Sequence, residues 1–577
     1  MSDAAPSPRA TASATELAPA RRFPRLVTAW ALVTLAGPGA LVPGGLWWLG
    51  SIGVALWIAT VARPGRRAFT LEWLVGGVAM GIQIWWIGYV FEATVPASMV
   101  VMGFYAALGG PLARRLVAGP SRALPFTLLA PLAWLFAEGL QHAVQIPFSW
   151  GWMRLGHLAA DDPFLIGSAR VWGAVGLSAV VAGVGGALAD AAARRLRTAA
   201  IGAVSWIGAA LLLGAVTSPP PVLERGPRLL MVQPGMTMER KQFASPNERL
   251  DVQLEITRSA LETLAAAGEA PPDAVVWAET MLPIELAAAG VIDAIRDETA
   301  SFAPWHGDPQ RLLDADRVEQ QIVRDLILER FLPKGTAFVS GVEEWVLLDG
   351  RIRRTNVGAA WVRDRPRQTV PKTHLVIGGE TAFGLDEIGF VRDFAYEMAG
   401  YVPDLLPGEA TGVLTIPDRV VAPSGALWHL ATTVCFDNAF VRPYTEPVRR
   451  ERVDAHLVLS NEAWYRTSFE FDQMMAFSKV MAAATGRSMA RCTNSGITGV
   501  IGPDGRERER LFVPGPDGRP TDRAVAGWML AEVPVPGPEA SAPPYTRFGP
   551  LWSLGLLVVA ILAGPLVAWR RSRASNR

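Results

Sequence analysis

Cysteine is nearly absent from this chain, because only Cys435 and Cys492 occur among its 577 residues. Two thiols cannot build a disulfide scaffold or a cysteine-rich zinc site, so each one is worth testing for a chemical role. Charged residues are also scarce, at 19%, whereas half of the residues are hydrophobic and 21 are tryptophan. A soluble protein of this length would carry more charge, which indicates a membrane component. No basic run suggests a nucleic-acid surface, so no nucleic-acid partner is expected.

Apolar segments of the sequence are candidates for membrane spans, since roughly 20 apolar residues in a helix cross a hydrocarbon core about 30 Å thick. Several are short or are interrupted by glycine and proline. The eight candidates are Leu26–Val42, Leu46–Ala62, Leu71–Phe91, Ala97–Pro111, Pro125–Leu140, Trp172–Ala191, Ala199–Val216 and Pro550–Trp569. A buried core helix would explain any one of them, but it would not explain how the arginines are distributed.

Arginines cluster in every second loop between these segments. The clusters are Arg21, Arg22 and Arg25; Arg63, Arg66 and Arg67; Arg114, Arg115 and Arg122; Arg194, Arg195 and Arg197; and Arg570, Arg571 and Arg573. Because positive charge stays on the cytoplasmic side, this alternation predicts eight spans with both chain ends in the cytoplasm.

The predicted organisation has five parts. Residues 1–22, rich in Ala, Ser and Pro, are expected to be a disordered cytoplasmic tail, and residues 23–216 a bundle of seven transmembrane helices. Residues 217–547 form an extracytoplasmic domain, 548–569 a last transmembrane helix and 570–577 a second cytoplasmic tail.

The extracytoplasmic part has short β-rich runs that alternate with helical patterns, which indicates an α/β domain. The predicted strands are Arg228–Val232, Ala274–Trp277, Thr336–Gly341, Asn356–Val362, Trp428–Cys435, His456–Ser460 and Ile497–Ile501. Ser245 is the expected N-cap of one helix, followed by proline at its first position. A second helix is expected over Asp472–Thr485. Residues 304–330 lack the apolar rhythm around them and are expected to form a surface insertion.

Four pieces of this domain carry groups suited to acyl transfer. They are Trp277-Ala278-Glu279; Pro371-Lys372-Thr373-His374-Leu375, with Glu380 eight residues after the lysine; Thr432-Thr433-Val434-Cys435-Phe436-Asp437; and Ser460-Asn461-Glu462-Ala463-Trp464. Taken alone, a cysteine at a strand end is more often a small buried hydrophobe. A thiol with a pKa of about 8.5 needs a base, which suits Glu279. The oxyanion of acyl transfer needs positive charge or N–H donors, which Lys372 and the backbone of Phe436 offer.

In this order and context the four pieces resemble the nitrilase, or carbon–nitrogen hydrolase, superfamily. With the membrane spans, the chain resembles the apolipoprotein N-acyltransferases over nearly its whole length. The matching segments also include Leu230-Met231-Val232-Gln233, Asp472-Gln473-Met474-Met475-Ala476 and Arg491-Cys492-Thr493-Asn494-Ser495-Gly496. The resemblance implies an αββα sandwich for the soluble domain and a catalytic triad of Glu279, Lys372 and Cys435, with Glu380 holding the lysine.

The chain departs from the family pattern at three places. The family usually has Trp-Pro-Glu, Leu-Val-Pro-Phe-Gly-Glu and a glutamate two residues after the nucleophile. Here the corresponding positions hold Ala278, Ile377-Gly378-Gly379 and Asp437. These changes affect loop shape and fine positioning, and they leave the triad intact.

The resemblance also implies the reaction. An acyl chain, expected to come from the sn-1 position of phosphatidylethanolamine, would pass through a thioester on Cys435 to the α-amine of an S-diacylglyceryl-cysteine lipoprotein. The enzyme would lie in the bacterial inner membrane as a multi-pass protein, with its catalytic domain on the periplasmic side, and would need no metal or cofactor.

Two other functions are open. One is a membrane-tethered amidase that uses water as the acceptor, although a hydrolase of soluble amides has no need of eight spans. The other is a non-enzymatic module on a nitrilase fold, which is disfavoured because Glu279, Lys372, Glu380 and Cys435 are all present.

Other residues of these segments are candidates for substrate contacts or for structural roles. Trp464, Asn461 and Trp277 are possible substrate contacts, and for Trp464 a packed core position is an equally good interpretation. Asp437 is expected to support the site. Cys492, at an expected strand start, is interpreted as structural and His374 as a surface or packing residue. The residues near the outer end of the fifth span are Glu138, His142, Phe148, Trp150 and Trp152, which could face the site or form an interfacial aromatic belt.

Overall fold

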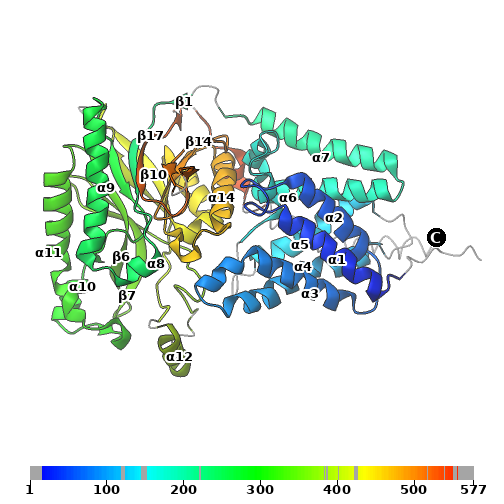
Figure 1. The fold of residues 1–577 in the computed structure, drawn as a ribbon, viewed down its shortest axis with the longest axis horizontal. Helices are drawn as coiled ribbons and strands as arrows, with labels where there is room; N and C mark the ends of the chain where they lie inside the picture. The colour runs from blue at the N-terminus through cyan, green and yellow to red at the C-terminus, as the bar shows by residue number, and fades with distance from the viewer. Residues whose placement is uncertain are drawn as a thin grey trace, which may run out of the picture.

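The chain folds into a helical part followed by an α/β part, which lie at the right and left of Figure 1 in this computed structural model. The structure describes residues 16–117, 124–143, 152–219, 223–382, 388–399, 402–420, 426–515, 518–537 and 540–549, together with residues 384, 551 and 555. The predicted last span and the tail after it fall almost wholly outside these residues.

Within the described residues, the helical part consists of seven α-helices and three short 3-10 helices. Its elements are α1 (Pro19–Leu35), α2 (Trp47–Val61), α3 (Ala68–Gln83), η1 (Trp85–Tyr89), α4 (Thr94–Val117), α5 (Phe126–Ala143), η2 (Leu155–Ala159), η3 (Ile166–Ser168), α6 (Ala169–Ala192) and α7 (Leu196–Val216). The seven predicted helices are therefore present, with shifted ends.

The start of α1 corrects the predicted disordered tail of residues 1–22. The helix begins at Pro19 and ends at Leu35, before the predicted Val42. Arg22 is fully buried and forms an ion pair with Glu72 at 2.8 Å. An arginine that pairs inside the bundle looks, in the sequence alone, like a basic residue flanking a span.

Within the part of the chain that the structure describes, three stretches are long and apolar enough to cross a membrane: Thr94–Val117, Ile166–Ala192 and Leu196–Val216. The outer face of α7 exposes apolar side chains such as Val204, Leu212 and Val216, as expected of a surface that meets lipid. In contrast, α1, α2 and α3 have only 17, 15 and 16 residues. The apolar helices fit a membrane protein, while the count of eight crossings stays a prediction.

The α/β part is built on two large β-sheets. One has six strands in the order β14-β13-β12-β11-β10-β9, and the other has the order β17-β2-β3-β6-β7-β5, with β4 beside β6 and β8 beside β7. The strands of the second sheet are β2 (Arg228–Gln233), β3 (Ala274–Trp277), β4 (Glu285–Ala287), β5 (Ser301–Phe302), β6 (Ala337–Leu348), β7 (Arg351–Trp361), β8 (Gln368–Pro371) and β17 (Gly527–Glu532). Those of the first are β9 (Gly412–Pro417), β10 (Leu427–Val434), β11 (Ala455–Ser460), β12 (Ser488–Thr493), β13 (Gly499–Ile501) and β14 (Glu507–Arg510).

Small strand pairs and helices complete the domain. The pairs are β1 (Leu223–Glu224) with β18 (Val535–Pro536), and β15 (Val513–Pro514) with β16 (Pro520–Thr521). The helices are α8 (Met238–Phe243), α9 (Pro246–Ala266), α10 (Val291–Arg296), η4 (Pro304–His306), η5 (Pro309–Asp314), α11 (Ala315–Glu319), η6 (Gln320–Phe331), α12 (Gly389–Ala399), η9 (Cys435–Ala439), α13 (Arg442–Arg450), η10 (Glu462–Tyr465) and α14 (Glu470–Thr485).

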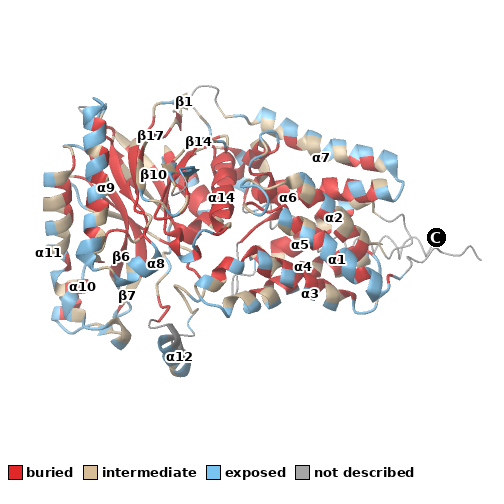
Figure 2. Cartoon of the chain, in the orientation of Figure 1, coloured by how far each residue is buried: buried red, intermediate tan, exposed pale blue. Residues whose placement is uncertain are grey.

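The two sheets face each other across one hydrophobic core. Leu230 and Val275 of one sheet belong to the same buried cluster as Leu430 and Leu457 of the other. Helix α9 packs on the outer side of the sheet that contains β2, and α13 and α14 pack on the outer side of the sheet that contains β10. In Figure 2, α9 is partly exposed, whereas α14 is buried along its whole length. The predicted αββα sandwich is thus the observed architecture.

Two helix ends confirm the sequence signals. The Ser245 hydroxyl accepts a hydrogen bond from the backbone N–H of Glu248, so it caps α9. Helix α14 begins at Glu470, two residues before the predicted start, and ends at Thr485 as predicted. The next residue, Gly486, has a φ of 63°, the left-handed conformation that glycine tolerates best.

The prediction that residues 304–330 form a surface insertion is wrong. Val323, Ile327 and Leu328 of the π-helix η6 are buried in the main core, and Leu312 and Ala315 are buried in a smaller cluster beside β6. In a π-helix, the spacing of the apolar residues on one face differs from that of an α-helix and from that of a β-strand. A search of the sequence for those two spacings therefore does not detect it. The segment therefore covers one face of the sheet.

Candidate active site

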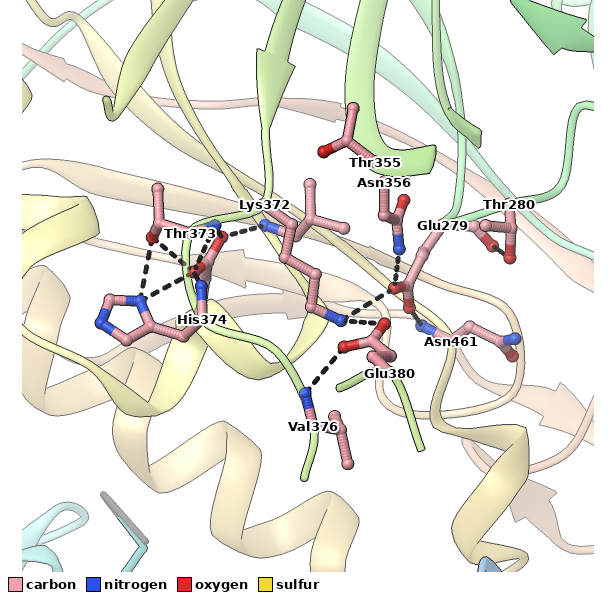
Figure 3. Close-up of polar contacts among 12 residues, drawn as sticks. Glu279, Thr280, Thr355, Asn356, Lys372, Thr373, His374, Val376, Glu380 and Asn461 are labelled. Atoms are coloured by element: carbon pink, nitrogen blue, oxygen red, sulfur yellow. Dashed lines mark hydrogen bonds and ion pairs between the residues drawn. The ribbon is translucent and has the colours of Figure 1, made fainter. Parts of the chain in front are cut away.

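Four strand ends bring the predicted catalytic pieces together, and Figure 3 shows the polar contacts around Glu279, Lys372 and Glu380. Glu279 lies two residues beyond β3, Cys435 directly follows β10, Asn461 directly follows β11, and Lys372 directly follows β8. Strands β2, β3 and β6 are mutually parallel, as are β10, β11 and β12. Their carboxyl ends therefore meet at one edge of the sandwich, where ligands bind in α/β folds.

Glu279 is buried and its two carboxylate oxygens are held by fixed donors. Oε1 accepts a hydrogen bond from Asn356 Nδ2 at 2.7 Å, and Oε2 accepts one from the backbone N–H of Asn461 at 2.8 Å. The Lys372 ammonium lies 3.3 Å from Oε1. The backbone of Gly341 packs against the backbone of Glu279. A Cβ at position 341 would lie 2.5 Å from the Glu279 Cα, so only glycine allows the two segments to pack this closely.

Lys372 is completely buried between two carboxylates. Its Nζ donates to Glu380 Oε1 at 2.7 Å and to Glu279 Oε1 at 3.3 Å. Burial alone would lower the pKa of Lys372, but the two carboxylates outweigh it and raise the pKa well above its ordinary value. The lysine is therefore a fixed positive charge, the property that an oxyanion stabiliser needs.

Glu380 closes the network from the other side. Its second oxygen accepts a hydrogen bond from the backbone N–H of Val376 at 2.8 Å. Burial raises the pKa of Glu380, which Lys372 opposes and Glu279 reinforces. Gly378, in the loop between them, adopts a φ of 76°, so the glycine that departs from the family pattern allows a left-handed turn here.

Cys435 sits at a sharp bend with a φ of 49°, which is strained for a residue with a side chain. This bend starts the short η9 helix and presents the thiol at the strand end. Burial raises the pKa of Cys435 well above its ordinary value, Glu279 raises it further, and Lys372 opposes the rise. The resting thiol is therefore protonated and needs a neighbouring base to become a nucleophile.

Asp437 holds the segment that carries the lysine. Its carboxylate accepts hydrogen bonds from the Thr373 hydroxyl at 2.7 Å and from the backbone N–H of His374 at 2.8 Å. The His374 ring stacks on Phe440, with ring centroids 3.8 Å apart, which agrees with the packing role predicted for it.

A cavity of about 250 Å³ opens over the thiol. Its polar lining includes Glu279, Lys241 and Arg354, and its apolar lining includes Val376, Val402, Leu405 and, from the helical part, Val90. Trp464 also lines it and is 39% exposed, so the core position considered for this residue is wrong. Asn461 also lines the cavity, and its contact with substrate stays a prediction.

Trp277 does not line this cavity. Its ring is fully buried against Phe338, and its indole N–H donates to the Thr257 hydroxyl at 3.1 Å. The prediction of a substrate contact is corrected, because the Trp277 ring lies on the side of β3 that α9 covers, whereas Glu279 lies beyond the end of the strand.

Trp152 also packs in the interior, not in an interfacial belt. It stacks on Phe436 behind the nucleophile, and its indole N–H donates to Gln473 of α14 at 2.7 Å. Glu138 pairs with Arg154 at 3.1 Å inside the helical part and lines a separate cavity there. Phe148 and Trp150 lie outside the described residues.

Cys492 is remote from this chemistry. It is fully buried near the end of β12, not at a strand start, and its thiol contacts the carbonyl oxygens of Val232 and Val276. Burial raises the pKa of Cys492 to about 12. The structural role predicted for it fits this position.

Two polar residues of the site were absent from the sequence prediction. Asn356 was included only as the start of a predicted strand, although an asparagine in a buried strand is itself a signal of a polar partner. Lys241 lies beyond the first core strand and belongs to no motif that the sequence analysis identified. Within the described part of the chain, no group of three His, Cys, Asp or Glu side chains is placed to hold a metal ion.

Comparison with known proteins gives matches along the chain. The family model described as the apolipoprotein N-acyltransferase N-terminal domain matches residues 31–187. An apolipoprotein N-acyltransferase of Ralstonia nicotianae is 25% identical over 93% of this chain and 92% of its own length. One of Azotobacter vinelandii is 26% identical, covering 93% of this chain and 94% of its own. A solved CN-hydrolase superfamily protein of Xanthomonas campestris aligns with 54% of this chain and 91% of its own, at 14% identity and a TM-score of 0.30.

Proposed function

We propose that the chain, which belongs to the apolipoprotein N-acyltransferase family, moves a fatty acyl chain from a phospholipid to the N-terminal amine of a diacylglyceryl lipoprotein. The observation that carries this proposal is the cavity above Cys435. It joins the buried thiol of Cys435 and the carboxylate of Glu279, which lies against Lys372, to an apolar wall that includes Val90 of the helical part. A site that opens toward apolar helices suits a substrate that lies in a bilayer.

The first half-reaction forms a thioester. Glu279 takes the thiol proton of Cys435 as the sulfur attacks the carbonyl carbon of the donor ester. Negative charge develops on the carbonyl oxygen, where Lys372 and the backbone N–H of Phe436 stabilise it. The C–O bond then breaks, and Glu279 returns the proton to the departing glycerol oxygen, which releases a lysophospholipid.

The second half-reaction transfers the acyl chain to nitrogen. The acceptor amine attacks the thioester carbonyl while Glu279 takes a proton from that amine. The C–N bond forms, the C–S bond breaks, and the sulfur of Cys435 regains a proton from Glu279. One carboxylate thus serves both steps, which is consistent with the two fixed donors, Asn356 and the Asn461 backbone, that hold it in place.

Phosphatidylethanolamine is the proposed donor, and the bacterial inner membrane, with the α/β part on the periplasmic side, is the proposed location. Loops on the cytoplasmic side would carry the arginine clusters. Asp437 and Glu380 are proposed as positioning residues that keep Lys372 aimed at the oxyanion.

The test is a reconstituted reaction with the full chain in phosphatidylethanolamine vesicles and a synthetic S-diacylglyceryl-cysteine peptide. The expected product is the N-acylated peptide with one lysophospholipid released per acyl chain. A membrane amidase or hydrolase would release free fatty acid from the donor and leave the peptide amine unmodified, which would contradict the proposal.

A further inference from the structure

A second chamber adjoins the catalytic cavity. It has a volume of about 450 Å³, and Lys241, Thr280 and Glu343 line both spaces. Thr280 directly follows the catalytic Glu279, so the boundary between the two spaces lies next to the reacting groups. The second chamber extends from there toward Arg249, Glu285 and Arg311, on α9, β4 and η5.

The charges in this chamber do not balance. Both carboxylates that line it already have arginine partners: Glu285 pairs with Arg311 at 2.9 Å and Glu343 with Arg354 at 3.6 Å. Among the residues that the structure describes, neither Lys241 nor Arg249 forms an ion pair. The chamber therefore presents two cations without anionic partners.

Lys241 and Arg249 are also poorly solvated. The Lys241 ammonium donates to the Thr280 hydroxyl, a neutral acceptor. The Arg249 Nε is buried without a hydrogen-bond partner in the described part of the protein. Burial lowers the pKa of Lys241 to about 8, which Glu279 and Glu343 only partly offset, and burial also lowers the pKa of Arg249. A partly buried cation of this kind gains most from an anion that can enter the chamber.

The donor in the proposed function supplies such an anion. In a glycerophospholipid, only the glycerol carbons separate the scissile ester from the phosphate, so the phosphate must lie close to the thiol during acylation. The diacylglyceryl-cysteine acceptor has no phosphate. The apolar wall at Val90 and Val376 suits acyl chains, which leaves the Lys241 side of the cavity for the polar group.

We propose that Lys241 and Arg249 form a subsite for the phosphodiester of the acyl donor, at the junction of the catalytic cavity and the second chamber. This assignment rests on the proposed function and adds to it a pair of donor-selecting residues. Lys241 would contact the phosphate at the junction, and Arg249 would contact it from the chamber side.

The experiment measures thioester formation on Cys435 in the full chain, in detergent micelles, without acceptor. Two donors are compared: phosphatidylethanolamine and p-nitrophenyl palmitate, an ester without a phosphate. In Lys241→Met and Arg249→Met, the ratio of the phospholipid rate to the neutral-ester rate should fall about tenfold or more, through a higher KM for the phospholipid. Lys241→Arg should restore much of that ratio, and Lys334→Met, at an exposed lysine of the same domain, should not alter it.

Equal losses with both donors would overturn the subsite, because they would mean that the residues act in catalysis or folding. A loss confined to transfer from a preformed acyl-enzyme to the peptide would also overturn it, and would assign the chamber to the acceptor. Inhibition of the wild type by soluble glycerophosphoethanolamine, but not by inorganic phosphate at equal concentration, would identify the phosphodiester of a headgroup as the ligand. If the wild type forms no thioester from either donor, the proposed function itself fails.

Discussion

Replacing Lys372 with methionine tests whether this lysine is the charge that holds the site together. The substitution keeps the length of the side chain but removes the ammonium that lies 2.7 Å from Glu380 and 3.3 Å from Glu279. Two carboxylates then face each other in a buried site. Removing one partner of a buried ion pair typically costs about 3–5 kcal/mol of unfolding free energy.

The expected change is measurable by thermal unfolding of the purified full chain in detergent. In domains of 150–250 residues, Tm falls by about 2–4 °C for each kcal/mol of unfolding free energy that is lost, and in larger proteins it falls less. The Tm of this variant should therefore fall on the order of 5–10 °C. Adding Glu380→Gln to Lys372→Met removes one of the uncompensated charges, and part of the lost Tm should return. Thioester formation should stay absent in both variants, because neither has a cation for the oxyanion.

The loss of Tm in Lys372→Met should depend on pH in a definite direction. Burial raises the pKa of Glu380, and Lys372 opposes that rise, so the pKa should lie higher still in Lys372→Met. A carboxyl group whose folded pKa is raised stabilises the protein at low pH and loses that contribution as the pH rises through the folded value. The deficit in Tm relative to the wild type should therefore shrink between about pH 7 and about pH 5. A deficit that grows on acidification, or a variant that melts with the wild type, would refute the reasoning.

Three further predictions concern the nucleophile, the base and the topology. Cys435→Ser should fold but lose acyl transfer, and Cys492→Ser should keep most of it; equal losses in a transfer assay would remove the assignment of the nucleophile. Glu279→Gln should abolish transfer yet shift the alkylation rate of the Cys435 thiol to lower pH, because a negative charge that raises the thiol pKa is lost; a shift to higher pH would contradict the assigned roles. A reporter enzyme active only outside the cytoplasm should work when fused near Gly350 and fail after Arg577, and the opposite pattern would reverse the predicted orientation.

The sequence predicted the α/β part well where its signals are local. Strand patterns located β2, β3 and β11 within a residue or so, and Ser245 and Gly486 marked helix ends that the structure contains. Strand β6 was predicted too short. Its outer half carries Glu343 and Glu344, whose charges interrupt the apolar pattern, but the strand continues because it forms a hairpin with β7, where Glu343 meets Arg354.

The site was predictable in its principal groups but not in their surroundings. Glu279 and Cys435 lie at the ends of strands that the sequence pattern located, whereas β8 before Lys372 was not predicted and Glu380 lies in the loop beyond it. The donor Asn356 lies opposite Glu279 only because β6 and β7 pair, and a long-range contact of this kind has no local signal. Trp277 and Trp152 were misplaced for a related reason, since a tryptophan in a sequence does not show whether its ring faces a cavity, a bilayer or a core.

The helix ends in the helical part were harder to predict, because an arginine near a helix end can either flank a membrane span or form an ion pair in the interior. Arg22 and Arg154 lie in the sequence as flanking or loop arginines, yet each forms an ion pair in the interior, with Glu72 and Glu138. The alternation of arginine clusters still predicts orientation, because it rests on whole loops and not on single side chains.

The central claim, that Cys435 carries the acyl chain, is tested most directly by trapping the enzyme with phospholipid in the absence of acceptor. The full chain is incubated with phosphatidylethanolamine, digested, and analysed by mass spectrometry. The account predicts one fatty acyl adduct on the peptide that contains Cys435, which neutral hydroxylamine removes and which the diacylglyceryl-cysteine peptide discharges with formation of an amide. An adduct on Cys492, an adduct that the acceptor does not discharge, or product formation by Cys435→Ser would contradict it.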